Sequence, residues 1–343
     1  MTIILFILIL GIIIFIHELG HFLFAKKFGI YVYEFSLGFG PKLFSFKRKN
    51  DETEYMIKAI PLGGYVAMAG EDALDDKVPE EMRLYSKPVW QRLLVMAAGV
   101  INNFILGFVL LFIMGLIYGS TSSSNVLYNI PETGSLYNLG VRSGDIVTKI
   151  NNKKTNNYDD IQTYLALATQ KRKDANIDIT IKSNNIEKTY NVKPTKAEDG
   201  NYYYGISVKI ERKKGVLPAL KYAKDKFVSI YKSMVIVIKS LLTRQLGVSS
   251  LSGPVGIYGV VDTAKNSVQM LLYLTAYLSI NIGFMNIIPF PAFDGGRILF
   301  LIIEKIKGSK LNPKFETYAN FIGFVILMGL MILVTIKDVI NLF

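Results

Sequence analysis

The chain of 343 residues contains no cysteine, one tryptophan and only two histidines. The absence of cysteine excludes disulfide bonds, thiolate metal ligands and a cysteine nucleophile, and it leaves the redox compartment open. Any site that uses an imidazole must therefore use His17 or His21. Charge is also scarce at the start of the chain, where Glu18 is the only charged side chain between residues 1 and 24.

Positive charge dominates the chain as a whole, with 39 Lys and Arg residues against 27 Asp and Glu residues. The lysines are scattered between apolar segments and form no arginine-rich stripe, which argues against nucleic-acid binding. They are frequent in residues 25–92 and again in residues 297–314. The positive-inside tendency predicts that both stretches lie in the cytoplasm, with the N-terminus and residues 119–214 on the outer side.

Long apolar segments account for the 51% hydrophobic content and the mean hydropathy of +0.33. A helix needs about 20 mostly apolar residues to cross a bilayer. Four segments qualify, namely residues 3–24, 93–118, 270–288 and 318–336. The first lacks the basic start and the small-residue cleavage site of a signal peptide, so we expect it to be retained.

Both histidines lie in the first apolar segment, where residues 17–21 read HELGH. A spacing of four residues is just over one helical turn, so the two imidazoles project from one face. They would hold one metal ion while Glu18 reaches the water bound to it. Polar groups at membrane depth are costly, which favours a site over two histidines that merely pack in a core.

A catalytic zinc ion needs a third protein ligand. Because no other histidine and no cysteine exists, this ligand must be a carboxylate, and Asp294 is the best placed. It follows two prolines that end the third apolar segment, and we expect the glycines at 295–296 to let the backbone turn tightly after it. The predicted orientation puts Asp294 and the histidines on the same, cytoplasmic side. The alternative is that Asp294 caps a helix.

Two glycine-rich, β-prone stretches, residues 35–41 and 60–68, follow the first segment. Non-helical backbone at membrane depth is tolerated only inside protein or along a cavity, so we expect a half-inserted β element beside the metal site. A surface hairpin is the alternative. In the second apolar segment, the pair at 102–103 (Asn-Asn) is predicted to join helices or to orient a metal ligand.

The composition becomes that of a soluble domain between residues 125 and 211, with a predicted helix at 158–169 and a strand at 177–182. Residues 134–151 resemble the signature of a bacterial PDZ domain, a fold that binds peptides by strand addition. A small α+β module without a ligand is the alternative. Residues 217–242 then read as an amphipathic interfacial helix, and residues 252–256 as a link to the third segment.

The HExxH motif, the PDZ-like insert and the sequence NIIPFPAFDGG at 286–296 together resemble the site-2 protease family of intramembrane zinc metalloproteases, in its bacterial regulator-of-sigma-E form. The resemblance covers nearly the whole chain. It implies bound Zn²⁺ with His17, His21 and Asp294 as ligands and Glu18 as the catalytic base. It further implies substrate or oxyanion contacts from residues that the family places near the substrate, here Asn281, Asn286, Gly63 and Gly64.

We therefore predict a mainly α-helical polytopic membrane protein with about four transmembrane helices, a membrane-associated β element and one inserted α+β PDZ-like domain. The expected domains are a first membrane half (1–118), the PDZ-like domain (119–214), an interfacial helix with its linker (215–252) and a second membrane half (253–343). The PDZ-like domain would lie outside the cell and the active site toward the cytoplasmic side of a bacterial plasma membrane.

The predicted activity is intramembrane cleavage of single-span membrane proteins or signal-peptide remnants. The expected partners are these substrates, a peptide or substrate segment at the PDZ-like domain, and the lipid bilayer, with no nucleic acid. The alternative is a non-catalytic metal- or peptide-binding membrane receptor, against which the intact Glu18 argues. A transporter would require further intramembrane acids or an internal repeat, and the sequence shows neither.

Overall fold

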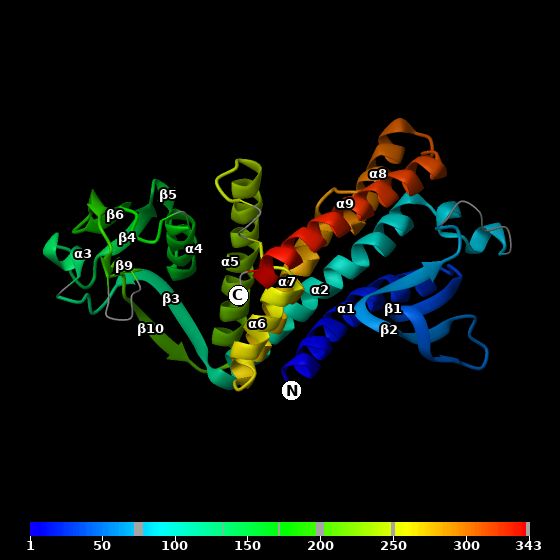
Figure 1. Cartoon of the computed structure of the whole chain (residues 1–343), viewed down its shortest axis with the longest axis horizontal. Helices are drawn as coiled ribbons and strands as arrows, with labels where there is room; N and C mark the ends of the chain where they lie inside the picture. Colours follow the sequence, from blue (N-terminus) through cyan, green and yellow to red (C-terminus); the bar gives the residue numbers. More distant parts are fainter. Residues whose placement is uncertain (72–77, 133, 171, 197–201, 248–250, 341–343) are drawn as a thin grey trace. The chain divides into compact units, whose positions relative to one another are not determined.

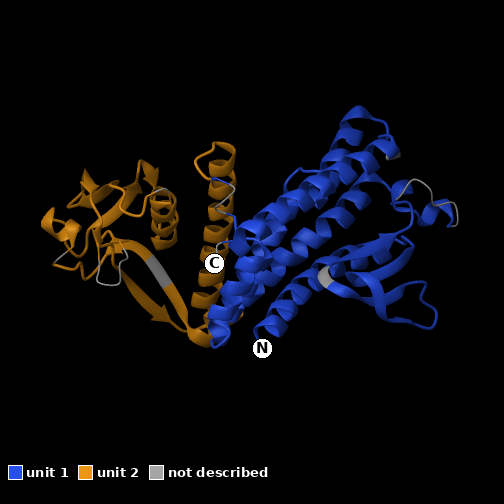
Figure 2. Cartoon of the chain, in the orientation of Figure 1, with its two compact units in different colours: residues 1–111, 247–343 blue, residues 112–246 orange. Residues whose placement is uncertain are grey.

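A computed structural model of the chain describes residues 1–71, 78–132, 134–170, 172–196, 202–247 and 251–340 (Figure 1). The chain divides into two compact units. Unit 1 comprises residues 1–111 and 247–343, and unit 2 comprises residues 112–246, as coloured in Figure 2.

Four helices carry most of the apolar sequence: α1 (Thr2–Lys27), α2 (Val89–Tyr118), α7 (Val268–Ile287) and α9 (Pro313–Ile340). Each is long and apolar enough to cross a membrane, α9 over Lys314–Ile340. At 1.5 Å per residue, the 26 residues of α1 reach about 39 Å, which exceeds the hydrocarbon thickness of a bilayer. Among the described residues, the prediction of about four helices long and apolar enough to span a membrane is confirmed.

The two glycine-rich stretches form a long hairpin of strands β1 (Val32–Lys47) and β2 (Glu54–Met68). The strands bend, so that residues 34–37 pair with 64–67 on one side and align with 54–57 on the other. Only the first half of β1 is well buried, up to Gly38, and its side chains pack on α1 and α2. The predicted β element therefore exists and contacts the helix that carries both histidines.

Two shorter helices complete unit 1, α6 (Pro254–Ala264) and α8 (Asp294–Lys307), together with the 3₁₀ turns η1 (Glu80–Met82) and η2 (Leu84–Ser86). The predicted link at 252–256 is in fact the start of α6, with Pro254 at its first position, where a proline needs no hydrogen-bond partner. Asp338 Oδ2 accepts from the N–H groups of Gly253 at 2.7 Å and Gly256 at 3.0 Å. The carboxylate of α9 thus caps α6.

The expected tight turn after Asp294 is wrong, because Gly295 and Gly296 are helical residues of α8. Neither has a positive φ. A β-carbon on Gly295 would lie 2.4 Å from the carbonyl oxygens of Ile287 and Ile288, and one on Gly296 would lie 2.4 Å from the carbonyl oxygen of Phe290. The glycines are therefore explained by the close approach of α8 to the end of α7, and the turn lies before Asp294.

Unit 2 is an antiparallel sheet with helices. Its strand order is β10-β3-β4-β6-β7, with β5 paired to β4, and a separate pair β8-β9. The strands are β3 (Ser120–Leu127), β4 (Ile146–Ile150), β5 (Lys153–Lys154), β6 (Ile177–Ser183), β7 (Ile186–Val192), β8 (Thr195–Lys196), β9 (Tyr202–Tyr203) and β10 (Val208–Lys213). The helices are α3 (Ser135–Asn138), α4 (Tyr158–Thr169) and α5 (Val216–Leu242).

The predicted helix at 158–169 and the strand at 177–182 are confirmed. Asn157 caps α4 by accepting from Asp160 N–H at 2.9 Å, as short polar side chains do at helix starts. Lys226 of α5 lies 2.6 Å from Asp159 of α4, so α5 packs within this unit. Part of the linker predicted after it, residues 248–250, lies outside the described residues.

Candidate metal centre

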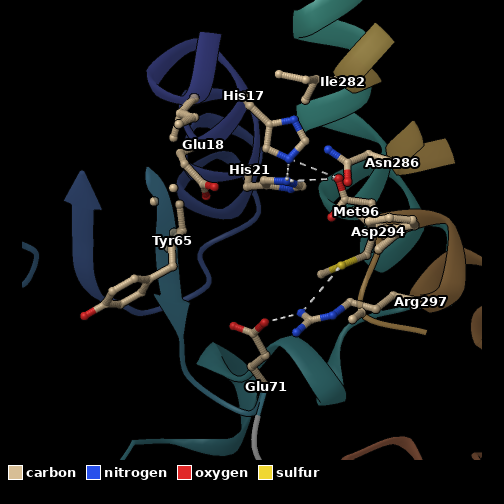
Figure 3. Close-up of a pocket in the computed structure, with 16 residues that line it drawn as sticks. His17, Glu18, His21, Tyr65, Glu71, Met96, Ile282, Asn286, Asp294 and Arg297 are labelled. Carbon is tan, nitrogen blue, oxygen red and sulfur yellow. Dashed lines mark hydrogen bonds and ion pairs between the residues drawn. The ribbon is translucent and has the colours of Figure 1, made fainter. Parts of the chain in front are cut away.

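Two helices bring three ligand-type atoms together in unit 1. Nε2 of His17 and Nε2 of His21, on α1, lie 3.2 Å apart. Oδ2 of Asp294, at the start of α8, lies 3.2 Å from the first and 3.4 Å from the second (Figure 3). Ligands around a tetrahedral zinc ion, at bond lengths of 2.0–2.1 Å, stand about 3.3 Å apart. The triangle therefore has the size that one zinc ion requires.

Each imidazole has a partner at its other ring nitrogen, Nδ1. His21 Nδ1 lies 2.8 Å from the carbonyl oxygen of Val95 and donates its proton there. His17 Nδ1 lies 3.2 Å from Nδ2 of Asn103. Because Oδ1 of the same amide is buried without a partner, turning the amide over would let Oδ1 accept the Nδ1 proton of His17. Both rings then present the Nε2 lone pair that a metal ion needs.

Asp294 completes the acceptor set. Its Oδ2 atom is buried and has no hydrogen-bond partner. Three acceptor atoms that face one another repel unless a cation lies between them. The donor set thus fits zinc, and it is the one group of three or more such ligands in the described part of the chain.

Glycines let α2 come close enough to support the two rings. A β-carbon on Gly99 would lie 2.3 Å from Nε2 of His21 and 2.8 Å from Nε2 of His17. A β-carbon on Gly20 would lie 2.4 Å from the carbonyl oxygen of Ala98. Small residues at a crossing allow two apolar helices to approach closely. Gly99 therefore leaves the space beside the imidazoles free of any side chain.

A cavity of about 310 Å³ opens beside these ligands. Its wall includes Glu18 and the predicted substrate residues Gly63, Gly64 and Asn286. In Figure 3, Glu18 lies beside His21 on the side of the cavity that faces Tyr65 of β2. A β-carbon on Gly64 would be only 3.1 Å from Cγ of Glu18, so the hairpin backbone approaches this carboxylate closely.

The fourth predicted residue, Asn281, does not line this cavity. Its side-chain oxygen is buried and has no hydrogen-bond partner. Asn281 and Asn286 lie five residues apart on α7, so they face different directions around the helix. The structure thus brings three of the four predicted substrate residues to the cavity.

Several residues of the site carried too weak a sequence signal to be predicted. Arg297 forms an ion pair with Glu71, and this pair closes one side of the cavity together with Met96 (Figure 3). Arg297 lies one helical turn after Asp294, which is the only hint that the sequence offers. Val95 contributes a backbone carbonyl and leaves no signal in the side-chain pattern.

The profile of peptidase family M50 matches residues 5–330 of the chain. The chain belongs to this family. The match confirms the predicted membership of the site-2 protease group of peptidases, because it extends from the HExxH helix into the last apolar helix.

Three relatives show how far the similarity to M50 peptidases extends. The regulator of sigma-W protease RasP of Bacillus subtilis is 34% identical over 425 residues, which cover all of this chain and 99% of that protein. The zinc metalloprotease RasP of Bacillus licheniformis is 33% identical over 422 residues, and the match covers 100% of this chain and 99% of that protein. The zinc metalloprotease RasP of Shouchella clausii is 30% identical over 392 residues, and the match covers 92% of this chain and 93% of that protein.

Proposed function

We propose that the chain is an intramembrane zinc metalloprotease in which His17, His21 and Asp294 hold the ion and Glu18 is the general base. The triangle of ligand atoms at the edge of a cavity, with two of its corners and Glu18 on one apolar helix, is the observation that carries the proposal. Two of the relatives are named zinc metalloproteases, and two imidazole nitrogens with one carboxylate oxygen are ligands that suit zinc. When bound, zinc supplies a Lewis acid that lowers the pKa of a coordinated water to about 7.

Glu18 has the position that the base requires. Its carboxylate lies in the cavity beside His21, within a helix that supplies no other charged group before residue 26. There it would take a proton from the attacking water and pass it to the leaving amine of the cleaved peptide bond. Asn286, also in the cavity wall, would donate a hydrogen bond to the oxyanion.

The hairpin offers a free strand edge to the substrate. Residues 64–67 pair with 34–37 on one side, and among the described residues no strand pairs with their other side. Gly63, Gly64, Tyr65 and Val66 of this edge line the cavity. A transmembrane substrate must unwind before its carbonyl groups are exposed, and pairing with this edge would replace its lost hydrogen bonds.

The proposed substrates are single-span membrane proteins or signal-peptide remnants. If unwinding limits the rate, a reporter whose span is weakened by Gly and Pro should be cleaved faster than one with a stable poly-Leu span. Comparing the two cleavage rates tests this directly, and equal rates would contradict the unwinding step.

Residues 119–214, which lie within unit 2, are proposed to form a PDZ-like domain. Strand β10 ends its sheet, so one side of it has no partner strand among the residues described. That edge would accept a peptide as an added strand. With the basic stretches of unit 1 in the cytoplasm of a bacterium, this domain and the N-terminus would lie outside the plasma membrane and the metal centre toward the inside.

The test is cleavage of a single-span reporter by the purified full-length protein in detergent. Cleavage should require zinc and should be lost in Glu18→Gln, which keeps the shape of the side chain but removes the base. Glu132→Gln, an exposed change in unit 2, is the matched control and should cleave normally. Zinc bound stoichiometrically without cleavage of any reporter would instead favour the non-catalytic receptor. Cleavage that survives both Glu18→Gln and chelation would refute the proposed site.

A further inference from the structure

The turn before Asp294 holds an alanine in a conformation that favours glycine. Phe293 N–H donates to the carbonyl oxygen of Phe290 at 3.1 Å, with Pro291 second in the turn and Ala292 third. Ala292 has a φ of +76°. Proline at the second position and a positive φ at the third are typical of a type II β-turn, where the third residue is usually Gly or Asn. A β-carbon is disfavoured there, so the surrounding structure must support this turn.

Helix α9 supplies support at two neighbouring points. Oδ1 of Asn320 accepts from the N–H of Ala292 at 3.2 Å, an amide that the turn itself leaves without a partner. Gly323, almost one helical turn further on, lies against Pro291. A β-carbon on Gly323 would be 2.4 Å from the carbonyl oxygen of Pro291. The turn is therefore held from one side by a hydrogen bond and by direct backbone contact.

These contacts stand out because little else in this stretch of α9 is buried. Among residues 314–333 of α9, only Gly323 is buried. The next buried residues, Val334 and Asp338, lie near the end of the helix. Asn320 and Gly323 thus make the contact of the middle of α9 with the loop that leads into the metal centre.

We propose that Asn320 and Gly323 form a clamp that positions Asp294 to bind the metal ion, with Asn320 as a positioning residue. The proposal rests on the proposed function, since it concerns the same site. Asp294 begins α8 two residues after Ala292, whereas the two histidines are carried by α1. Without the clamp, Ala292 would leave its positive φ, the turn would change type, and the carboxylate would shift relative to the imidazoles.

The experiment measures the zinc affinity of the purified full-length protein in detergent by competition with a chromophoric chelator. Asn320→Ala removes the hydrogen-bond acceptor, and Gly323→Ala pushes α9 away from Pro291. Each should lower zinc affinity about tenfold, as loss of an outer support commonly does. Gly329→Ala, on the same helix with nothing within 4 Å of the added carbon, is the matched control and should bind zinc like the wild type.

A rescue separates positioning from a general structural role. Glycine adopts a φ of +76° without steric strain, so Ala292→Gly should restore most of the zinc affinity lost in Asn320→Ala. A residue that merely stabilised α9 would not be rescued by a change in the loop. Should Asn320→Ala fail to fold, the pair Gly323→Ala and Gly329→Ala carries the test alone.

The outcomes are distinct. Wild-type zinc affinity in both Asn320→Ala and Gly323→Ala would overturn the clamp and leave the proposed function intact. Lowered affinity in Asn320→Ala that Ala292→Gly fails to restore would overturn it as well. A wild-type protein that binds no zinc would refute the proposed function itself, and the clamp with it.

Discussion

Replacing Gly99 by alanine should damage the metal centre. The added β-carbon would lie 2.3 Å from Nε2 of His21 and 2.7 Å from Cε1 of His17. Ordinary contact between such atoms begins at about 3.4 Å, so the rings or α2 must move by about 1 Å. Metal–ligand distances tolerate only about 0.2 Å.

The required movement is thus about five times what a zinc site tolerates. Changes to groups that only support a ligand lower metal affinity 10–100-fold, and here the ligand atoms themselves are displaced. We therefore expect Gly99→Ala to lower zinc affinity at least about 100-fold. The substitution also raises helix propensity by about 1 kcal/mol, so the helix itself should not be weakened.

The assay is chelator competition on the purified protein, with thermal unfolding of the zinc-free form as a check on the fold. Gly11→Ala in α1 is the matched control, since nothing lies within 4 Å of its added carbon. It should bind zinc like the wild type. A Gly99→Ala protein that binds zinc with wild-type affinity would refute the placement of the ion between the two imidazoles.

Three further predictions follow from single contacts. Asn103→Leu removes the partner of His17 Nδ1 and should lower zinc affinity 10–100-fold, measured by the same competition; an unchanged affinity would exclude this orienting role. Asp338→Ala removes the cap from residues 253–256 and should lower the free energy of unfolding by about 1–2 kcal/mol in thermal or denaturant unfolding while zinc affinity stays constant. A hydrogen bond from Lys26 holds the pKa of Asp51 well below its usual range. The ionised Asp51 therefore stabilises the folded protein at pH values above about 3.9, the pKa of the group in the unfolded chain, and this contribution is lost as the pH falls further. Asp51→Asn should accordingly make the free energy of unfolding less sensitive to acid between about pH 4 and pH 2.

The structure also explains where prediction of the site reached its limit. Glycines 295 and 296 were expected to form a turn after Asp294, yet they belong to α8 and are required by close contact with α7. Glycine serves both purposes, and a single sequence does not distinguish a positive φ from a close approach. The actual turn places Ala292, which has no turn signature, at the strained position.

The sequence by itself determined the features that depend on local periodicity and on the bilayer as a solvent. The length and apolarity of the four helices follow from what lipid permits, and the shared face of His17 and His21 follows from the helical repeat. Asp294 was singled out because the chain has no other histidine and no cysteine to complete a zinc site.

Only the tertiary structure decided which groups surround these residues. Val95, a partner of His21, left no signal in the sequence. The sequence named the pair at 102–103 as a candidate for orienting a ligand, but the contact of Asn103 with His17 and the open space at Gly99 depend on how α2 crosses α1. The same holds for the strand edge at 63–66 and for the contact of Asn320 with the loop before Asp294. Helix crossings and strand registers arise from side-chain packing over the whole unit, so no local pattern in the sequence encodes them.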